Sequence, residues 1–539
     1  MTGHPVSRTT RRAATAALLT TSFLLTACGS GGGGSDGGGG QARSGGTLTF
    51  AVGSDAGCVD PQQVASNDTI YSVRQIVDSL TDQDPTTGKI VPWLAKSWDI
   101  SSDATTFTFH LRSGVTFSDG SELTAQVVKD NFDAVPKLGA LGTLAEGYLS
   151  GVKSTTVVDP LTVKVTFQQP NAQFLQATST HSLGIESSAS AKKTPQQKCS
   201  QGVVGSGPFV LKQYVQNQSI TLAKRTGYAW GSSLWHKSGE AYLDKVVFKV
   251  VPEAGVRAGS LQSGQVDAIS SVGKANEAAL KGGQVTLQRR ANPGVVFGLS
   301  FNNSRPVLKD ARVRQAIGFA IDRKQIADTV FPTGTQPATS VLAHTTPDYA
   351  DLSSDLTTDA AKAKSLLDAA GWKAGSDGIR TKDGKKLSLT VDWIPNSATN
   401  QPALELIQQQ LKAVGVGLTL KQLQVTQLAP TLQSGDYDAA WGNVTRADPD
   451  ILRSSFSTKL ANFYRLPVTP LDTSLTGQAA TTDSTKRAEL VKQAQELIVQ
   501  NAYYAPVVEL QTQIGVAKKV HGLNFDASSR IQLHDTWIG

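Results

Sequence analysis

The chain alternates between two hydrophobic spacings, and this alternation predicts a mixed α/β fold. In some segments apolar residues recur at every second position, as in a strand with one buried face. In others they recur at every third or fourth position, as in an amphipathic helix. The two spacings alternate from Thr47 onward. The sequence has no repeat of solenoid length, so a repeat architecture is not expected.

Three segments have the pattern of strands. In residues 106–111, Phe107, Phe109 and Leu111 share one face, and His110 belongs to the polar face opposite. The same alternation, or an unbroken apolar run of strand length, recurs in two later segments: 163–167 and 245–251. We therefore expect His110 to be a polar-face residue of a strand.

Two segments have the spacing of amphipathic helices. The apolar positions of the first are Val313, Ile317, Ala320 and Ile321. Those of the second are Leu490, Val491, Ala494, Leu497 and Ile498. We interpret both faces as buried core.

Length and composition indicate a globular protein of several packed units. The chain has 539 residues, of which 39% are hydrophobic and 18% are charged, so a sizeable core can form. The formal charge is +7, but residues 1–27 hold three arginines and no acid, so the rest of the chain carries only +4. A nucleic-acid partner is therefore not expected, because binding would need basic residues clustered on one surface.

Residues 1–27 have the organisation of a signal peptide. Three arginines precede an apolar stretch shorter than the roughly 20 residues of a membrane-spanning helix. The stretch ends in Leu25-Thr26-Ala27-Cys28, which resembles a bacterial lipobox. This resemblance implies cleavage before Cys28 and lipidation of its sulfur, which anchors a protein to the membrane. An uncleaved anchor is the alternative, and the Arg11-Arg12 pair leaves twin-arginine export open.

Residues 28–46 begin with Cys28, the expected lipidation site. Glycine is too dense in this segment for a core to form, so we expect a flexible tether. Residues 33–37 match the G-x-S-x-G nucleophile pattern. That pattern requires a strand-turn-helix, and the context here is coil. We therefore assign no catalytic residue to this segment.

Two cysteines, Cys58 and Cys199, remain beside Cys28. In an exported chain such a pair favours a disulfide over two free thiols. The seven histidines are scattered, and neither a C-x-x-C pair nor a phosphate-binding glycine loop is present. The sequence thus supports no metal, cofactor or catalytic residue. An exported hydrolase remains an alternative, because triad residues can lie far apart in sequence.

Three blocks of sequence resemble a single family. The first is GKIVPWLAKSWDISSDATTFTFHLRSGVTFSDGSELTAQVVKDNF at residues 88–132, and the second is VGSGPF at 204–209. The third comprises FNN at 301–303, DARVRQAI at 310–317 and AIDR at 320–323. Together they resemble the extracellular solute-binding proteins of family 5, the peptide and nickel class that serves ATP-driven importers. Only Ser206 departs from the family's pattern in the second block.

The resemblance implies a two-lobed periplasmic-binding-protein-like fold, type II of the large peptide-binding cluster, with an extra domain inserted in lobe I. We expect these segments: lobe I at 47–80, 201–295 and 506–539, the inserted domain at 81–200, and lobe II at 296–505. The chain would then cross between the lobes near residues 296 and 505. Such lobes close on a ligand like a hinge.

The resemblance also places ligand-binding residues in the segment 437–450. In peptide-binding relatives this segment carries an Asp that pairs with the α-ammonium group of the peptide, and the matching position here is Thr445. Burying an ammonium group without its carboxylate costs several kcal/mol, so the binding of free-amine peptides is in doubt. The candidate cleft residues are Trp441, Asn443, Thr445, Arg446, Asp448, Trp393, Asn67 and Asp68.

Three of these candidates have a functional and a structural interpretation. Arg446 suggests a ligand with a carboxylate or another anion, because guanidinium binds such groups in a bidentate manner; a surface ion pair is the alternative. Asp448 could replace the missing acid, or cap the turn beside Pro449. Trp441 could stack on the ligand or fill the core.

We therefore expect a monomeric, lipid-anchored receptor at the outer face of the plasma membrane. It would capture a small solute, a peptide or a peptide-like compound, and pass it to the permease of an ABC importer. Nickel or a metal chelate is the alternative ligand within the family. A receptor that signals through a membrane partner and an exported hydrolase are the alternatives from other classes.

Overall fold

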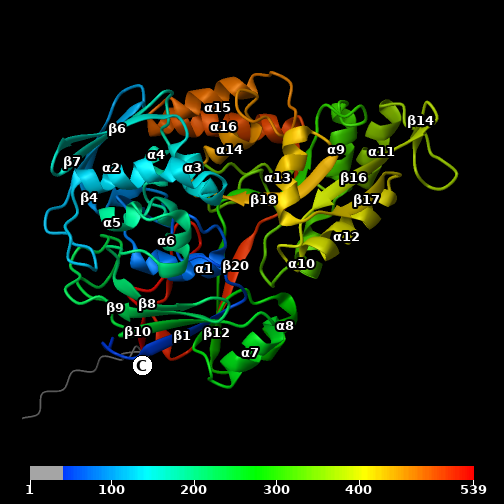
Figure 1. The fold of residues 1–539 in the computed structure, drawn as a ribbon. Helices are drawn as coiled ribbons and strands as arrows, with labels where there is room; N and C mark the ends of the chain where they lie inside the picture. Colours follow the sequence, from blue (N-terminus) through cyan, green and yellow to red (C-terminus); the bar gives the residue numbers. More distant parts are fainter. Residues whose placement is uncertain (1–40) are drawn as a thin grey trace, which may run out of the picture. The chain divides into compact units, whose positions relative to one another are not determined.

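The computed structural model describes residues 41–539, and Ala42–Gly539 form one compact unit. The expected signal peptide, the lipidation site Cys28 and the G-x-S-x-G match lie outside the described residues. Within them, three sheets of four or more strands organise the chain (Figure 1).

The first sheet has seven strands in the order β12-β20-β11-β1-β10-β9-β8. Their bounds are β1 (Thr47–Val52), β8 (Phe209–Val215), β9 (Ser219–Lys224), β10 (Lys245–Val250), β11 (Ala268–Ile269), β12 (Val285–Ala291) and β20 (Gln511–Ala517). β1 runs parallel to β10 and β11, and the other pairs are antiparallel. Phe50 and its alternate neighbours in β1 pack against α1 (Asn67–Val73), whereas Ala51 packs toward α7 (Ala254–Gln262) and α8 (Lys274–Leu280). Both faces of the sheet are therefore covered.

The second sheet is antiparallel, with β4 (Ala95–Ile100), β5 (Thr106–Leu111), β7 (Thr162–Phe167) and β6 (Val152–Asp159) in that order. The predicted strand at 106–111 is confirmed, and Phe107, Phe109 and Leu111 are fully buried. They pack with α2 (Ala125–Ala134), α3 (Thr143–Leu149) and α4 (Phe174–Ala177). His110 faces the other way, with Nε2 2.9 Å from Asp99 Oδ2.

The third sheet has the order β17-β16-β18-β13-β19. Its strands are β13 (Gly294–Phe301), β16 (Ser388–Trp393), β17 (Gly417–Gln422), β18 (Ala439–Thr445) and β19 (Tyr504–Val508). One core contains residues of α9 (Ala311–Ala320), α10 (Arg323–Val330), α11 (Ala360–Ala369) and α12 (Asn400–Lys412). A second contains residues of α14 (Ile451–Phe456), α15 (Leu471–Ala479) and α16 (Ser484–Gln500).

Both predicted helical faces lie on helices of this region, α9 and α16, with one exception. Ile321 is extended rather than helical, although it is fully buried. The Asp322 side chain accepts a hydrogen bond from the Gln325 backbone N–H and so caps α10, and this forces α9 to end before Ile321.

The remaining helices and strands are shorter or peripheral. They are η1 (Arg74–Ile76), β2 (Thr81–Gln83), β3 (Ile90–Pro92), η2 (Val135–Leu141), η3 (His181–Leu183), α5 (Ser188–Ala191), α6 (Pro195–Gln201), η4 (Ser353–Asp355), β14 (Thr381–Lys382), β15 (Lys385–Lys386), α13 (Val425–Ser434), β21 (Val520–His521), β22 (Asn524–Phe525), β23 (Ile531–Gln532) and β24 (Trp537–Ile538).

Two short crossings connect the first sheet to the third. β12 leads to β13 through Asn292 and Pro293, and β19 leads to β20 through Glu509 and Leu510. The Asn292 backbone N–H donates to the Leu510 carbonyl at 2.7 Å, so the crossings lie side by side. Gly294 begins β13 with a φ of +110°, a conformation that favours glycine. Paired crossings of this kind can act as a hinge.

A disulfide joins Cys58 to Cys199, the pairing that the sequence favours. Beside it, Lys198 Nζ lies 3.4 Å from Asp60 Oδ2 and 3.0 Å from Glu186 Oε2, and all three side chains are at most 1% exposed. Burial and the nearby Asp60 raise the pKa of Glu186 well above its usual range. One lysine therefore faces two carboxyl groups, and Glu186 tends to keep its proton.

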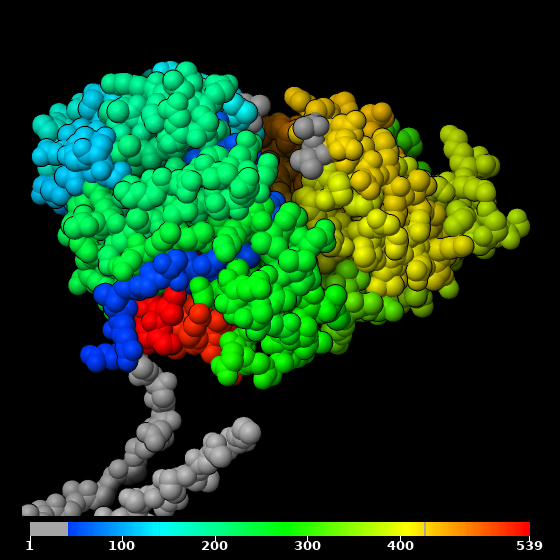
Figure 2. All heavy atoms as spheres, turned by 60° about the horizontal axis from the view of Figure 1, so that its bottom comes forward, coloured from blue at the N-terminus to red at the C-terminus, as the bar shows by residue number. Residues whose placement is uncertain are grey.

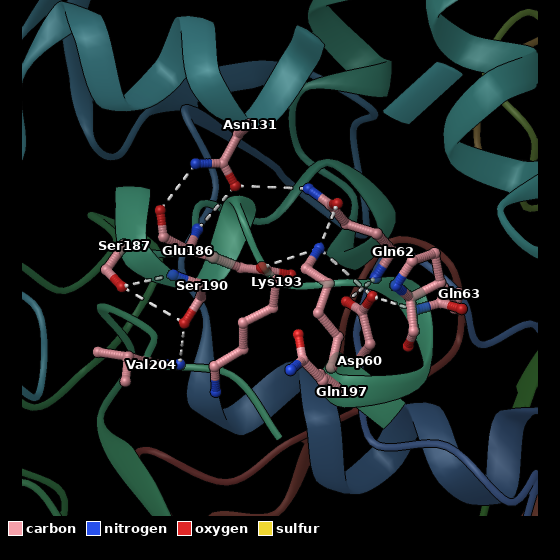
Figure 3. Close-up of polar contacts among 12 residues, drawn as sticks. Asp60, Gln62, Gln63, Asn131, Glu186, Ser187, Ser190, Lys193, Gln197 and Val204 are labelled. Atoms are coloured by element: carbon pink, nitrogen blue, oxygen red, sulfur yellow. Dashed lines mark hydrogen bonds and ion pairs between the residues drawn. The ribbon is translucent and has the colours of Figure 1, made fainter. Parts of the chain in front are cut away.

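Hydrogen bonds extend this cluster to α2. Figure 3 shows the Asn131 side chain between Glu186 and Gln62: it donates to the Glu186 carbonyl at 2.7 Å and accepts from the Glu186 N–H at 3.0 Å. The Gln62 side chain donates to Asn131 and accepts from Lys198. Lys198 and Asp60 thus have hydrogen-bond partners within the protein, whereas the Glu186 carboxyl group has only its ion pair with Lys198.

The start of the described chain lies against its C-terminal segment. In the space-filling view the first residues (blue) cross next to the last ones (red) (Figure 2). Both segments belong with the first sheet, since β1 and β20 flank β11.

Candidate functional site

The predicted ligand segment, residues 437–450, consists of β18 and the loop that follows it. β18 lies between β16 and β13, and the Arg446 backbone N–H donates to the Pro293 carbonyl at 3.0 Å. The loop therefore begins beside the crossings between the first and third sheets.

Trp441 lies in the core of the third sheet. It is 2% exposed, stacks on Phe297 with ring centroids 5.3 Å apart, and its Nε1–H donates to Asn400 Oδ1 at 3.1 Å. Trp393 is also buried, in the same core. The contacts of Trp441 favour its core-filling interpretation over a role in the cleft, whereas the buried Nε1–H of Trp393 has no hydrogen-bond partner among the described residues.

Asp448 already has a cationic partner. It is 5% exposed, and Arg487 donates to its two carboxylate oxygens at 2.6 and 3.1 Å. One of these oxygens also accepts the Asp450 backbone N–H at 2.8 Å. Because the ion pair satisfies the carboxylate, Asp448 is a structural residue of the turn rather than a free partner for an ammonium group.

Arg446 has a different environment. Its guanidinium lies over the ring of Tyr148, with Cζ 4.8 Å from the ring centroid, and Nη1 is 3.5 Å from Gln173 Oε1. No carboxylate of residues 41–539 forms a salt bridge with it, in contrast to the nearby Arg453 and Arg487. A cation that is partly exposed and has only neutral neighbours can bind an anionic ligand.

Asn443 and Thr445 lie just before Arg446, at the end of β18. Both are partly exposed, so their side chains offer neutral hydrogen-bonding groups. Neither can neutralise an ammonium group.

Asn67 and Asp68 lie at the start of α1. The Asp68 carboxylate accepts the Gly53 backbone N–H at 2.9 Å and the Ser54 hydroxyl at 3.2 Å, so it orders the loop after β1. Asn67 Oδ1 accepts from Arg530 Nε at 3.4 Å. Both side chains are partly exposed, and the hydrogen bonds of Asp68 stabilise the loop after β1.

The segment 81–200 contacts the third-sheet region at several points. Gln83 Nε2 donates to the Ala447 carbonyl at 2.9 Å, and the Ala172 backbone N–H donates to the Ala479 carbonyl at 2.9 Å. Figure 1 shows α4 beside the end of α15. Together with the Arg446 to Gln173 contact, these bonds place β2 and α4 against the loop after β18.

A cavity of about 370 Å³ adjoins this contact on the first-sheet side. It is lined by aromatic, charged and neutral polar side chains from four separate segments: Asp82, Gln83, Trp235, Arg289, Arg290 and Asp526. Burial raises the pKa of Asp82 to about 6. A cavity with aromatic walls and a few convergent polar groups is typical of a site for a small organic ligand.

No sequence pattern indicates these lining residues. Gln83, Arg290 and Asp526 belong to no motif, and they meet only because β2, β12 and the C-terminal strands fold together. Within residues 41–539, no group of three or more His, Cys, Asp and Glu side chains is placed to hold a metal ion.

Comparison with protein families matches residues 89–461 to "Bacterial extracellular solute-binding proteins, family 5 Middle". Among curated relatives, the dipeptide-binding protein of Escherichia coli (strain K12) is 27% identical over 469 residues, which cover 82% of this chain and 84% of the relative. The glutathione-binding protein GsiB of Salmonella typhimurium (strain LT2) is 27% identical over 483 residues, with coverage of 86% and 88%.

Solved structures show the same fold. NikA from Brucella suis in complex with Fe(III)-EDTA matches with a TM-score of 0.79 at 24% identity, covering 92% of this chain and all of NikA. DppA from Helicobacter pylori in complex with the peptide STSA matches with a TM-score of 0.73 at 24% identity, covering 92% and 98%. The fold is thus the two-lobed fold of periplasmic binding proteins. None of the helices within residues 41–539 has the length and hydropathy needed to span a bilayer.

Proposed function

Because the chain belongs to family 5 of the bacterial extracellular solute-binding proteins, we propose that it captures a peptide or a peptide-like compound and delivers it to an ABC importer. Within the site, the observation that supports this proposal is that Arg446 has no carboxylate partner among the described residues. Arg446 lies at the junction of β18, α3 and α4.

The ligand that fits best has a free carboxylate and no buried α-ammonium group. Arg446 would bind the carboxylate, and Asn443 and Thr445 would donate to or accept from neutral amide groups. The position that carries an Asp in peptide-binding relatives is Thr445, and Asp448 is already paired with Arg487. Within residues 437–450 an ammonium group would therefore find no free counter-ion.

Lobe closure completes the proposal. We place lobe I at residues 47–80, 201–295 and 506–539, its inserted domain at 81–200 and lobe II at 296–505. The assignment of strands to the three sheets supports this division. The paired crossings at Asn292 and Leu510 would act as the hinge, and a ligand that contacts both lobes would favour the closed state.

Residues 1–28 support an anchored location. We propose that the signal peptide is removed and that a lipid on Cys28 holds the monomeric protein at the outer face of the plasma membrane. A Cys28→Ser variant should then be released into the soluble extracytoplasmic fraction, whereas retention of this variant in the membrane would contradict the anchor.

Native mass spectrometry of the domain purified without added ligand tests the proposed ligand class. The native complex is compared with the species that denaturation releases. Released compounds built from amide-linked amino acid units are expected, and an Arg446→Gln variant should carry less of them. Since the protein is proposed to bind without catalysis, turnover of generic ester or peptide substrates would contradict this assignment.

A metal chelate is the second candidate, because its carboxylates would also pair with Arg446. A released chelate mass in the same experiment would favour this candidate over a peptide.

A further inference from the structure

One buried carboxamide in the second-sheet region has no hydrogen-bond partner. Gln176 in α4 is 2% exposed, and neither its Nε2 nor its Oε1 has a partner among residues 41–539. A buried polar group without a partner is costly, and such groups are few in native proteins. The Gln176 amide therefore needs an explanation.

The direction of the side chain follows from helical geometry. Phe174 points into the aromatic core of the second-sheet region, with its ring centroid 5.1 Å from that of Phe107 and 4.8 Å from that of Phe167. Gln176 is two residues further on, about 200° around the helix, so it faces away from that core. Gln173 is about 60° from Gln176 and on its side of the helix, and it contacts Arg446. The unpaired amide thus faces the side from which α4 meets the loop after β18.

Gln83 adds a third unpaired atom on the neighbouring strand. β2 packs against α4, where the Thr81 hydroxyl donates to the Leu175 carbonyl at 2.8 Å. Gln83 Nε2 donates to the Ala447 carbonyl and so marks the same interface, whereas its buried Oε1 has no partner in the described part of the chain. One donor group and two acceptor atoms are therefore unsatisfied in α4 and β2, the two elements that meet the loop after β18.

We propose that Gln176 and Gln83 form a neutral hydrogen-bonding subsite for the amide groups of the ligand whose carboxylate binds Arg446. A backbone amide offers both a carbonyl and an N–H, and the Gln176 side chain can satisfy both at once. This inference rests on the proposed function and names two binding residues on the wall opposite β18. It also accounts for amide groups that would otherwise be buried at a cost.

A Gln176→Met variant tests the subsite, because methionine has nearly the same length and lacks the amide. If the amide has no protein partner, the ligand-free variant should unfold at the same temperature as the wild type or higher. Its affinity for N-acetyl-L-alanyl-L-alanine, measured by calorimetry, should fall about 10-fold or more.

Gln495→Met is the matched control. Gln495 is fully buried, but its side chain bonds to Ser340, Ala350 and Asp348. Its replacement should lower the unfolding temperature and leave the affinity of the folded protein unchanged. The opposite patterns of the two variants would separate a ligand-facing amide from a structural one.

Three results would overturn the inference. The first is a Gln176→Met variant that binds N-acetyl-L-alanyl-L-alanine as tightly as the wild type. The second is a loss of stability like that of Gln495→Met. The third is wild-type protein that binds neither this compound nor L-alanyl-L-alanine, which would contradict the proposed peptide class itself. If Gln176→Met weakens the binding of L-alanyl-L-alanine only, this result would support the subsite. It would contradict the proposal that the ligand has no buried ammonium group.

Discussion

The cluster around Lys198 and the polar groups of α4 around Gln176 are both buried, but they differ in whether they have partners within the protein. Lys198 pairs with Asp60 and Glu186, and a disulfide closes the cluster. Among the described residues, Gln176 has no side-chain hydrogen-bond partner and Arg446 has no carboxylate partner. The ion pairs of Lys198 stabilise the fold, whereas we interpret the unpaired groups where α4 and β2 meet the loop after β18 as groups that bind a ligand.

We expect the largest loss of stability from Lys198→Met, because this variant removes the cation of the buried cluster. It leaves two buried carboxyl groups without their cation, and the loss of one partner of a buried ion pair costs about 3–5 kcal/mol. Denaturant unfolding would measure this loss. The control is Lys192→Met, because Lys192 is 74% exposed and lies 3.9 Å from Asp130. A loss below about 1 kcal/mol for Lys198→Met would show that the cluster does not stabilise the fold.

The disulfide is expected to have the next largest effect. It closes a segment with a sequence separation of 141, and removing such a link costs about 2–5 kcal/mol. The Cys58→Ala, Cys199→Ala double variant should lose this stability in denaturant unfolding. The variant should bind ligand with unchanged affinity while folded, because the disulfide lies outside the cleft. A large loss of affinity in the folded variant would instead link the cluster to the site.

Asp82→Asn should have the smallest effect, and its sign depends on pH. Burial raises the pKa of Asp82 to about 6 in the folded protein, from the ordinary value of 3.8. Between about pH 4 and 6 the folded state therefore holds a proton that the unfolded state has released, so the contribution to stability falls as the pH rises. Asparagine does not titrate, so the variant should gain stability relative to the wild type from pH 4 to pH 7. If the free energies of unfolding of the wild type and of Asp82→Asn change in parallel with pH in this range, the raised pKa of Asp82 is contradicted.

Hydrophobic spacing predicted the α/β class and five individual elements, whereas the two-lobed fold came from the resemblance of three sequence blocks to a family. The alternation at Phe107 and Phe109 reflects one buried strand face, and the spacing at Val491 and Ala494 reflects one buried helix face. Ile321 was misassigned to a helix because it is buried in either conformation. The deciding feature was the cap at Asp322.

The site could be predicted only in part. The sequence places Arg446 and Asp448 in one segment but cannot distinguish their roles, because Arg487, the partner of Asp448, lies 39 positions away. Gln83 and Gln176 have no local pattern, and only the packing of β2 and α4 makes them buried and unpaired.

The central claim is that Arg446 binds the carboxylate of a peptide-like ligand, and a calorimetric cycle tests it most directly. Wild type, Arg446→Gln and the surface control Arg312→Gln are each titrated with N-acetyl-L-alanyl-L-alanine and with its C-terminal amide. The amide should bind the wild type and the control about 10- to 100-fold more weakly than the acid, as expected for a charge-assisted hydrogen bond. Arg446→Gln should bind the two compounds about equally. Acid binding by Arg446→Gln that is as tight as in the wild type would contradict the claim.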